Sequence, residues 1–144
     1  MEIKTNEQLQ ALTKEWKKRM GLNDWLLEVV FAGKEEMDGA WGLCWAEWKY
    51  KTAHIKIIKW EDVIEAQKDP DSEPLGSIYK KLDLDMERVL VHELMHCHTN
   101  IFRTMIKEDH TESFALVDEQ TVELLARALI QAKYNEGELK WQIT

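Results

Sequence analysis

The segment RVLVHELMHCH, from Arg88 to His98, carries three of the five histidines of this 144-residue chain. His92 and His96 stand four positions apart, so on a helix both imidazoles project from one face and can aim at a common point. Glu93 is rotated about 100° from His92, near enough to reach a water molecule held at that point. Two imidazoles beside a carboxylate are the residues that hydrolytic zinc requires: Zn²⁺ would acidify the water, and Glu93 would accept its proton as a general base.

The sequence around this motif predicts a buried helix. Helical periodicity runs from about Asp83 to Thr99, with Asp83 or Asp85 available as the N-cap. Exposed helix faces are seldom as apolar as this segment, so a helix that merely carries solvated histidines fits poorly. The apolar neighbours of the motif are Val89, Leu90, Val91, Leu94 and Met95.

A catalytic zinc ion has three protein ligands and one open position, so a third ligand must come from elsewhere in the chain. The position six residues after the motif is Phe102, which cannot bind zinc, and His98 falls on the wrong side of the helix for the same ion. Two candidates remain: His110, in the connector after the helix, and an acid on the last helix, which we expect from about Thr111 to Tyr134.

The last helix offers several acids at different angles to its predicted buried face. Asp118 and Glu119 fall within about 65° of the centre of that face, whereas Glu123 lies near 100° and should be more solvated. An acid on a buried face needs a compensating partner, and a divalent cation is a good one. The angular positions of Asp118 and Glu119 do not decide which of the two is the third ligand, but the longer side chain of glutamate favours Glu119. The residues that define the face are Ala115, Val122, Leu125, Ala126 and Leu129.

The elements that must position these residues can also be predicted. An amphipathic helix is expected from about Thr5 to Met20, capped by Thr5 or Asn6 and ended by Gly21. A strand should run from about Trp25 to Phe31, and WGLCWAEW followed by KTAHIKII predicts an antiparallel hairpin. In the hairpin, Ala53, Ile55 and Ile57 should face one side, and Trp41, Trp45 and Trp48 should lie in the core or in the wall of a cleft.

From Trp60 to Leu82 the pattern weakens, and KDPDSEPLGS reads as a turn-rich connection and a candidate flap. The order helix, strand, hairpin, long loop, helix, helix predicts one α+β domain over residues 1–144. Its helices should lie on one side of a small antiparallel or mixed sheet.

The charge and the cysteines limit the partners and the compartment. The net charge of −8 argues against nucleic acid and anionic membranes, whose binding needs dense Lys and Arg. Cys44 and Cys97 form no CxxC pair, no leader opens the chain, and no apolar run approaches the roughly 20 residues of a membrane span. We therefore expect a cytoplasmic protein whose partners are proteins, peptides or small molecules, and the sequence carries no signal of an oligomeric state.

Four stretches together resemble small phage and prophage metallopeptidases of the minimal gluzincin type, and the likeness runs over almost the whole chain. In gluzincins a glutamate on the helix after the motif is the third ligand, and the resemblance assigns that role to Glu119. It implies a zincin-like fold, one zinc ion and a peptide-cleaving endopeptidase in a bacterial or phage-infected cytosol. It also implies that an extended substrate pairs with an edge strand of the hairpin. The four stretches are LNDWLLEV, YKTAHIKI, LVHELMHCH and EQTVELLARAL.

Two alternatives stay open beside this interpretation. SprT-like proteases, which cut DNA-bound proteins, take a later histidine as third ligand, and DHTESF around His110 is similar; however, this chain lacks the cysteines of their zinc ribbon. A catalytically silent zinc-binding interaction protein of phage origin is the other, although a merely structural zinc has no use for Glu93. For the group that stabilises the oxyanion, Tyr79, His110 and Tyr134 are candidates, each more readily explained as structural.

Overall fold

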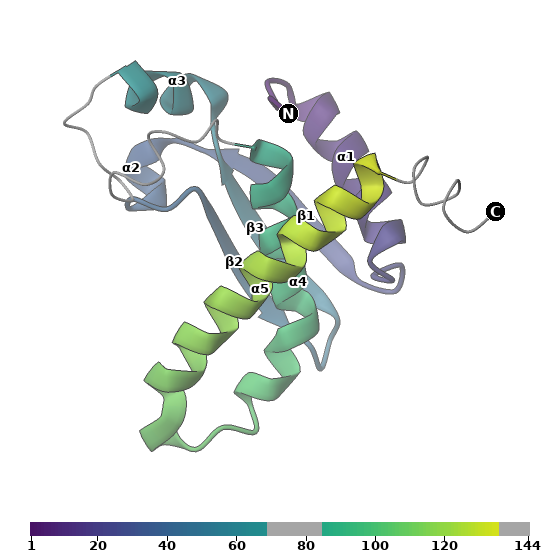
Figure 1. Cartoon of the computed structure of the whole chain (residues 1–144), viewed down its shortest axis with the longest axis vertical. Coiled ribbons are helices and arrows are strands. Elements are labelled where there is room, and N and C mark those ends of the chain that lie inside the picture. The colour runs from purple at the N-terminus through teal and green to yellow at the C-terminus, as the bar shows by residue number, and fades with distance from the viewer. Residues whose placement is uncertain (69–84, 136–144) are drawn as a thin grey trace.

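The chain folds as an α+β unit around a small mixed sheet (Figure 1). The structure, a computed structural model, describes residues 1–68 and 85–135. Strands lie in the order β1-β3-β2, with β1 parallel to β3 and β2 antiparallel to β3. Their bounds and those of the helices are β1 Leu26–Ala32, β2 Gly42–Glu47, β3 Thr52–Ile58, α1 Asn6–Arg19, α2 Lys34–Met37, α3 Trp60–Lys68, α4 Met86–Arg103, η1 Glu108–His110 (a 3₁₀ turn) and α5 Thr111–Tyr134.

The sheet is amphipathic, with one face turned to the helices. Ala53, Ile55 and Ile57 of β3 are buried to 6%, 0% and 0% exposure, which confirms the predicted hairpin and its inward row. Helix α1 contacts β1, and α4 contacts β2 and β3. On the opposite face Trp45 is half exposed and stacks beside His54.

The first helix begins and ends where its sequence predicts. The Thr5 hydroxyl accepts a hydrogen bond from the Gln8 amide, and the Gln8 side chain accepts one from the Thr5 amide, which is a capping box. Gly21 follows the helix with a φ of +68°, a conformation that favours glycine. Trp16, 1% exposed, anchors the helix in the core.

Helix α4 carries the HELMH motif in a buried setting. The Asp85 carboxylate accepts hydrogen bonds from the amides of Glu87 and Arg88, so Asp85 is the N-cap. The helix continues to Arg103, one turn beyond its predicted end. Helix α5 spans Thr111–Tyr134 as predicted and packs along α4.

Two predictions need correction, and one short helix was not predicted. Residues 60–68 form a helix, α3, where a connection was expected; Glu61 and Asp62 in its first turn favour a helix that is too short to show a periodic pattern. The short helix α2 was not predicted. Leu125 is 43% exposed and does not belong to the buried face of α5, whose fully buried members are Val122 and Ala126. The candidate flap, Lys68–Ser77, and Tyr79 lie outside the described residues, except for Lys68, which ends α3.

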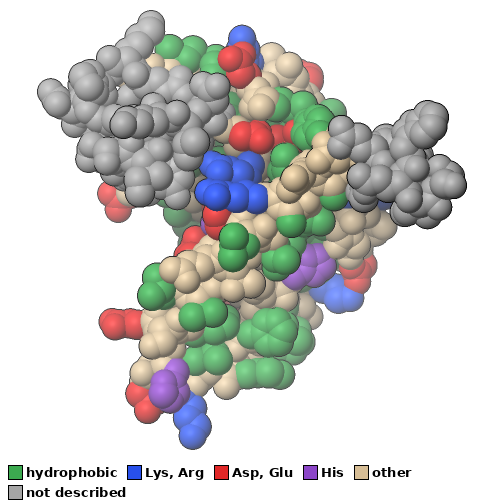
Figure 2. Space-filling model, in the orientation of Figure 1, with side chains coloured by type: hydrophobic (Ala, Val, Ile, Leu, Met, Phe, Trp, Pro, Cys, Tyr) green, Lys and Arg blue, Asp and Glu red, His purple; other side chains and the backbone are tan. Residues whose placement is uncertain are grey.

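The error at Leu125 has a simple physical source. Helix α5 packs mainly on α4, so only a narrow stripe of it is buried, while apolar side chains lie on its other faces too. Figure 2 shows these hydrophobic side chains gathered over the lower part of the molecule, where α5 runs. Periodicity alone cannot then locate the buried stripe. The exposed apolar residues of α5 include Leu116, Val117 and Leu124.

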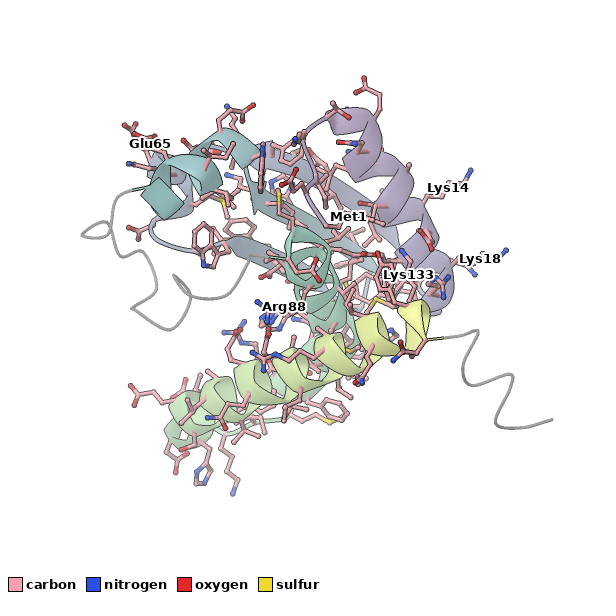
Figure 3. All side chains as sticks on the ribbon, turned by 45° about the horizontal axis from the view of Figure 1, so that its top comes forward. Met1, Lys14, Lys18, Glu65, Arg88 and Lys133 are labelled. Atoms are coloured by element: carbon pink, nitrogen blue, oxygen red, sulfur yellow. The ribbon has the colours of Figure 1, made fainter. Side chains whose placement is uncertain are left out.

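A buried ionic cluster fastens the far end of α5. The Glu87 carboxylate is fully buried and accepts hydrogen bonds from Trp16 Nε1 (2.8 Å), from Lys133 Nζ (2.5 Å) and from the Tyr134 hydroxyl. Burial by itself raises the pKa of Glu87, but these donors outweigh it and hold the pKa below its usual range. Figure 3 shows Lys133 where the last turn of α5 approaches α1. The cluster therefore fixes how α5 lies on α4.

We expect Lys133→Met to destabilise the protein strongly. Removing one partner of a buried ion pair leaves Glu87 as a poorly compensated buried charge, which costs about 3 kcal/mol or more. Urea unfolding followed by circular dichroism measures this loss. Lys14→Met, at an exposed lysine of α1, is the matched control and should shift the free energy of unfolding by less than about 0.5 kcal/mol.

Candidate metal centre

Helix α4 presents both motif histidines from one face. The ring centroids of His92 and His96 lie 5.1 Å apart. Their side chains are only 15% and 17% exposed. Both rings turn their Nε2 atoms toward α5, which crosses in front of α4 in Figure 1.

Helix α5 brings Glu119 to the two imidazoles. One carboxylate oxygen of Glu119 lies 3.0 Å from His92 Nε2 and the other lies 3.0 Å from His96 Nε2. One ligand atom from each of the three residues lies within 4.8 Å of the other two. Two imidazole nitrogens and one carboxylate oxygen are the donor set of a catalytic zinc site, so these residues fit the ion. Glu119 is 59% exposed, which leaves the outer side of the group open to solvent.

The Nδ1 atom of each imidazole also contacts a carboxylate. His92 Nδ1–H donates to Glu123 Oε2 at 2.7 Å, and His96 Nδ1 lies 3.3 Å from Asp118 Oδ2. Such partners fix the tautomer and the orientation of a ligating histidine and leave Nε2 free to bind the metal. Glu123 and Asp118 thus contact the imidazole nitrogens that do not face Glu119.

Glu123 is itself held by two arginines. Its Oε1 atom forms an ion pair with Arg88 Nη1 (3.1 Å) and accepts a hydrogen bond from Arg127 Nε (3.0 Å). Figure 3 shows Arg88 reaching from α4 toward α5. The side chain of Glu123 is 24% exposed, less than that of Glu119, so the prediction that Glu123 is the more solvated acid is wrong. The spacing of three acids at positions 118, 119 and 123 was the signal in the sequence for this arrangement.

The remaining candidates lie elsewhere. His110 is exposed at the start of α5, nine positions before Glu119 and so about 13 Å away along the helix. His98 Nε2 bonds the carbonyl oxygen of Met20 at 2.7 Å and links α4 to the end of α1. Tyr134 bonds Glu87 at the opposite end of α5, far from Glu119. In the described part of the chain, the structure thus brings none of these three to the group.

His92, His96 and Glu119 interact as charged partners, and their pKa values shift accordingly. Burial by itself lowers the pKa of His92, but the carboxylates of Glu119 and Glu123 outweigh it and raise the pKa to about 10. The pKa of His96 is also raised, by its contact with Glu119 against the effect of burial. Hydrogen bonds from the two imidazoles hold the pKa of Glu119 well below its usual range. His92 is therefore protonated at neutral pH unless a cation displaces its proton.

This protonation predicts opposite pH effects on the metal-free and the zinc-loaded protein. The pKa of His92 is raised from 6.5 to about 10, so the fold binds more protons than the unfolded chain between these values. The ion pairs of His92 stabilise the metal-free fold fully below about pH 6.5, and this contribution is lost as the pH rises toward 10. Zinc binds neutral imidazole, so its affinity rises over the same range.

We expect the Tm of the metal-free protein to fall between pH 7 and pH 8.5 while the gain in Tm from saturating zinc grows. Differential scanning calorimetry with and without zinc measures both changes. In metal-free His92→Gln, the Tm should fall less steeply with pH than in the metal-free wild type. A slope that is the same in His92→Gln and in the wild type would contradict the assignment of the effect to His92.

The base candidate lies beside the group in a cleft. Glu93 is 7% exposed, and burial raises its pKa to about 7. The cleft has a volume of about 700 Å³ and runs between β2 on one side and α4 and α5 on the other. Trp45 of β2 borders the cleft, although its ring lies beside His54 on the opposite face of the sheet and is half exposed. Trp41 and Trp48 pack partly buried against the core. Glu93, His96 and Glu119 all line this cleft.

Comparisons with known proteins add no relative. No protein-family model, curated protein or solved structure matches the chain. Among residues 1–68 and 85–135, none of the helices combines the length and the apolar composition needed to cross a lipid bilayer.

Proposed function

We propose that this protein is a zinc-dependent endopeptidase with a zincin-like fold. The observation that carries the proposal is the convergence of His92, His96 and Glu119 on one point beside the buried carboxylate of Glu93. A site that merely stabilises a fold has no use for a base and fills all positions of its zinc with protein ligands. Here Glu119 leaves the group open toward the cleft.

In the proposed hydrolysis each residue of the site has a separate role. Zn²⁺, when bound by His92, His96 and Glu119, would acidify a water molecule and polarise the substrate carbonyl. Glu93 accepts the proton of the attacking water and returns it to the leaving amine, a task suited to a carboxylate whose pKa lies near neutrality. Asp118 and Glu123 hold the two imidazoles in orientation by their Nδ1 atoms.

Strand β2 supports binding of an extended peptide. It lies at an edge of the described sheet. The Ile58 amide donates to the Trp41 carbonyl, so residues 41, 43, 45 and 47 direct their backbone groups to β3. The alternate residues Gly42, Cys44 and Ala46 therefore direct theirs to the free edge, above the cleft. A peptide that pairs with this edge passes beside Glu93 and His96, which line the cleft.

Hydrolysis of unfolded protein tests the proposal. Zinc-loaded protein should cleave fluorescently labelled casein, lose this activity with a chelator and regain it with added zinc. The cleaved products, read by mass spectrometry, should include internal bonds, since the activity proposed is that of an endopeptidase. If zinc-loaded protein cleaves neither casein nor a mixed library of unstructured peptides, the proposal is wrong.

A further inference from the structure

At Gly42 the edge strand β2 lies against the side chain of Glu93. A Cβ atom built on Gly42 would lie 2.7 Å from Cγ, 2.7 Å from Oε1 and 2.9 Å from Cδ of Glu93. Nonbonded carbon atoms pack best at about 3.5–4.0 Å, so these separations are overlaps. All three atoms belong to the side chain of Glu93. Position 42 has room for a side chain only if Glu93 moves.

The backbone gives no other reason for glycine at this position. The described glycines with a positive φ are Gly21 and Gly39, so Gly42 does not need the conformational freedom of glycine. A glycine inside a strand weakens it, because it adds backbone entropy to the unfolded chain and packs no side chain. Close approach of another group is the usual compensation, and here that group is Glu93.

We propose that Gly42 is a positioning residue for Glu93: its missing side chain lets the backbone of β2 lie against the carboxyl group and hold it beside His92 and His96. The inference rests on the proposed function, since it assigns a role in placing the base. Glu93 is 7% exposed and lines the cleft, so its carboxyl group can yield to a side chain at position 42 by turning into the cleft. An added methyl group at position 42 therefore pushes the flexible end of Glu93 out of place and leaves the three ligand residues untouched.

Gly42→Ala should keep its zinc and lose turnover. Displacing a reacting group by about 1 Å can cost about 10²-fold in rate, so we expect kcat on labelled casein to fall by this order with KM nearly unchanged. Gly33→Ala is the matched control. At Gly33 the φ is −73° and the nearest atom to an added Cβ is Asp62 Oδ2, at 3.7 Å, so activity and zinc content should stay as in the wild type.

A double-mutant cycle tests the contact without any activity. Glu93→Asp removes one methylene group and makes room for the methyl group of Gly42→Ala. We expect Gly42→Ala to lower the Tm by several degrees in the wild-type background and by less than half of that in the Glu93→Asp background. Equal losses in both backgrounds would overturn the role of Gly42. If Gly42→Ala alone does not fold, a folded double variant supports the contact and an unfolded one overturns it.

The two measurements separate this inference from the proposed function. If the wild type cleaves neither casein nor the peptide library, the peptidase proposal fails, while the Tm cycle still decides whether Gly42 fixes the place of Glu93. If the wild type cleaves casein and Gly42→Ala cleaves it at the same kcat, Gly42 does not position the base, although the peptidase proposal stands.

Discussion

Glu93→Gln is expected to bind zinc as the wild type does and to hydrolyse casein about 10²–10⁴-fold more slowly, the usual contribution of a general base. Glutamine keeps the shape of the side chain, so it fits against Gly42 and leaves the three ligand residues in place. It cannot accept the proton of the attacking water. Zinc content by atomic absorption and kcat on labelled casein together measure the result.

The control for this variant is a glutamate that lies far from the cleft. Glu65 is exposed on α3, remote from Arg88 and α5 in Figure 3. Glu65→Gln removes the same charge and should keep both zinc and activity. Hydrolysis retained by Glu93→Gln would remove the base assignment, whereas loss of zinc in that variant would show that Glu93 supports the metal site itself.

The local part of the site could be read from the sequence because helical geometry fixes it. The four-residue spacing of His92 and His96 places their rings on one face of α4 whatever packs against it. Thr5 and Asp85 as helix caps were predictable for the same reason, since capping depends on residues within one turn.

What depends on packing between helices was harder to predict. The angle of each acid on α5 was measured from a face that included Leu125, which is exposed, so Glu123 was expected in solvent. In the structure Glu123 contacts Nδ1 of His92. The Glu87 cluster and the ion pair between Arg88 and Glu123 determine how α5 packs on α4 and so place Glu123 there. The role of Gly42 was not predicted either, since it depends on a contact between β2 and α4 that no local pattern encodes.

The identity of the third ligand gives the second large expected effect. Glu119→Gln should lose stoichiometric zinc, because an amide replaces the only carboxylate that reaches both Nε2 atoms in the described residues. His96→Ala should lose zinc as well. His110→Ala should keep it, because His110 lies outside the group. The variants therefore distinguish the gluzincin arrangement from the SprT-like one.

Asp118→Asn should give an intermediate zinc affinity among these variants. It changes a group that orients His96 without binding the metal, and such changes weaken metal affinity by about 10–100-fold. Titration of each metal-free variant with zinc against a chromophoric chelator should rank affinity as wild type and His110→Ala, then Asp118→Asn, then Glu119→Gln. Zinc retained by Glu119→Gln but lost by His110→Ala would move the third ligand to His110. Since α5 would then have to shift by about two and a half turns along α4, that outcome would also contradict the packing of the two helices.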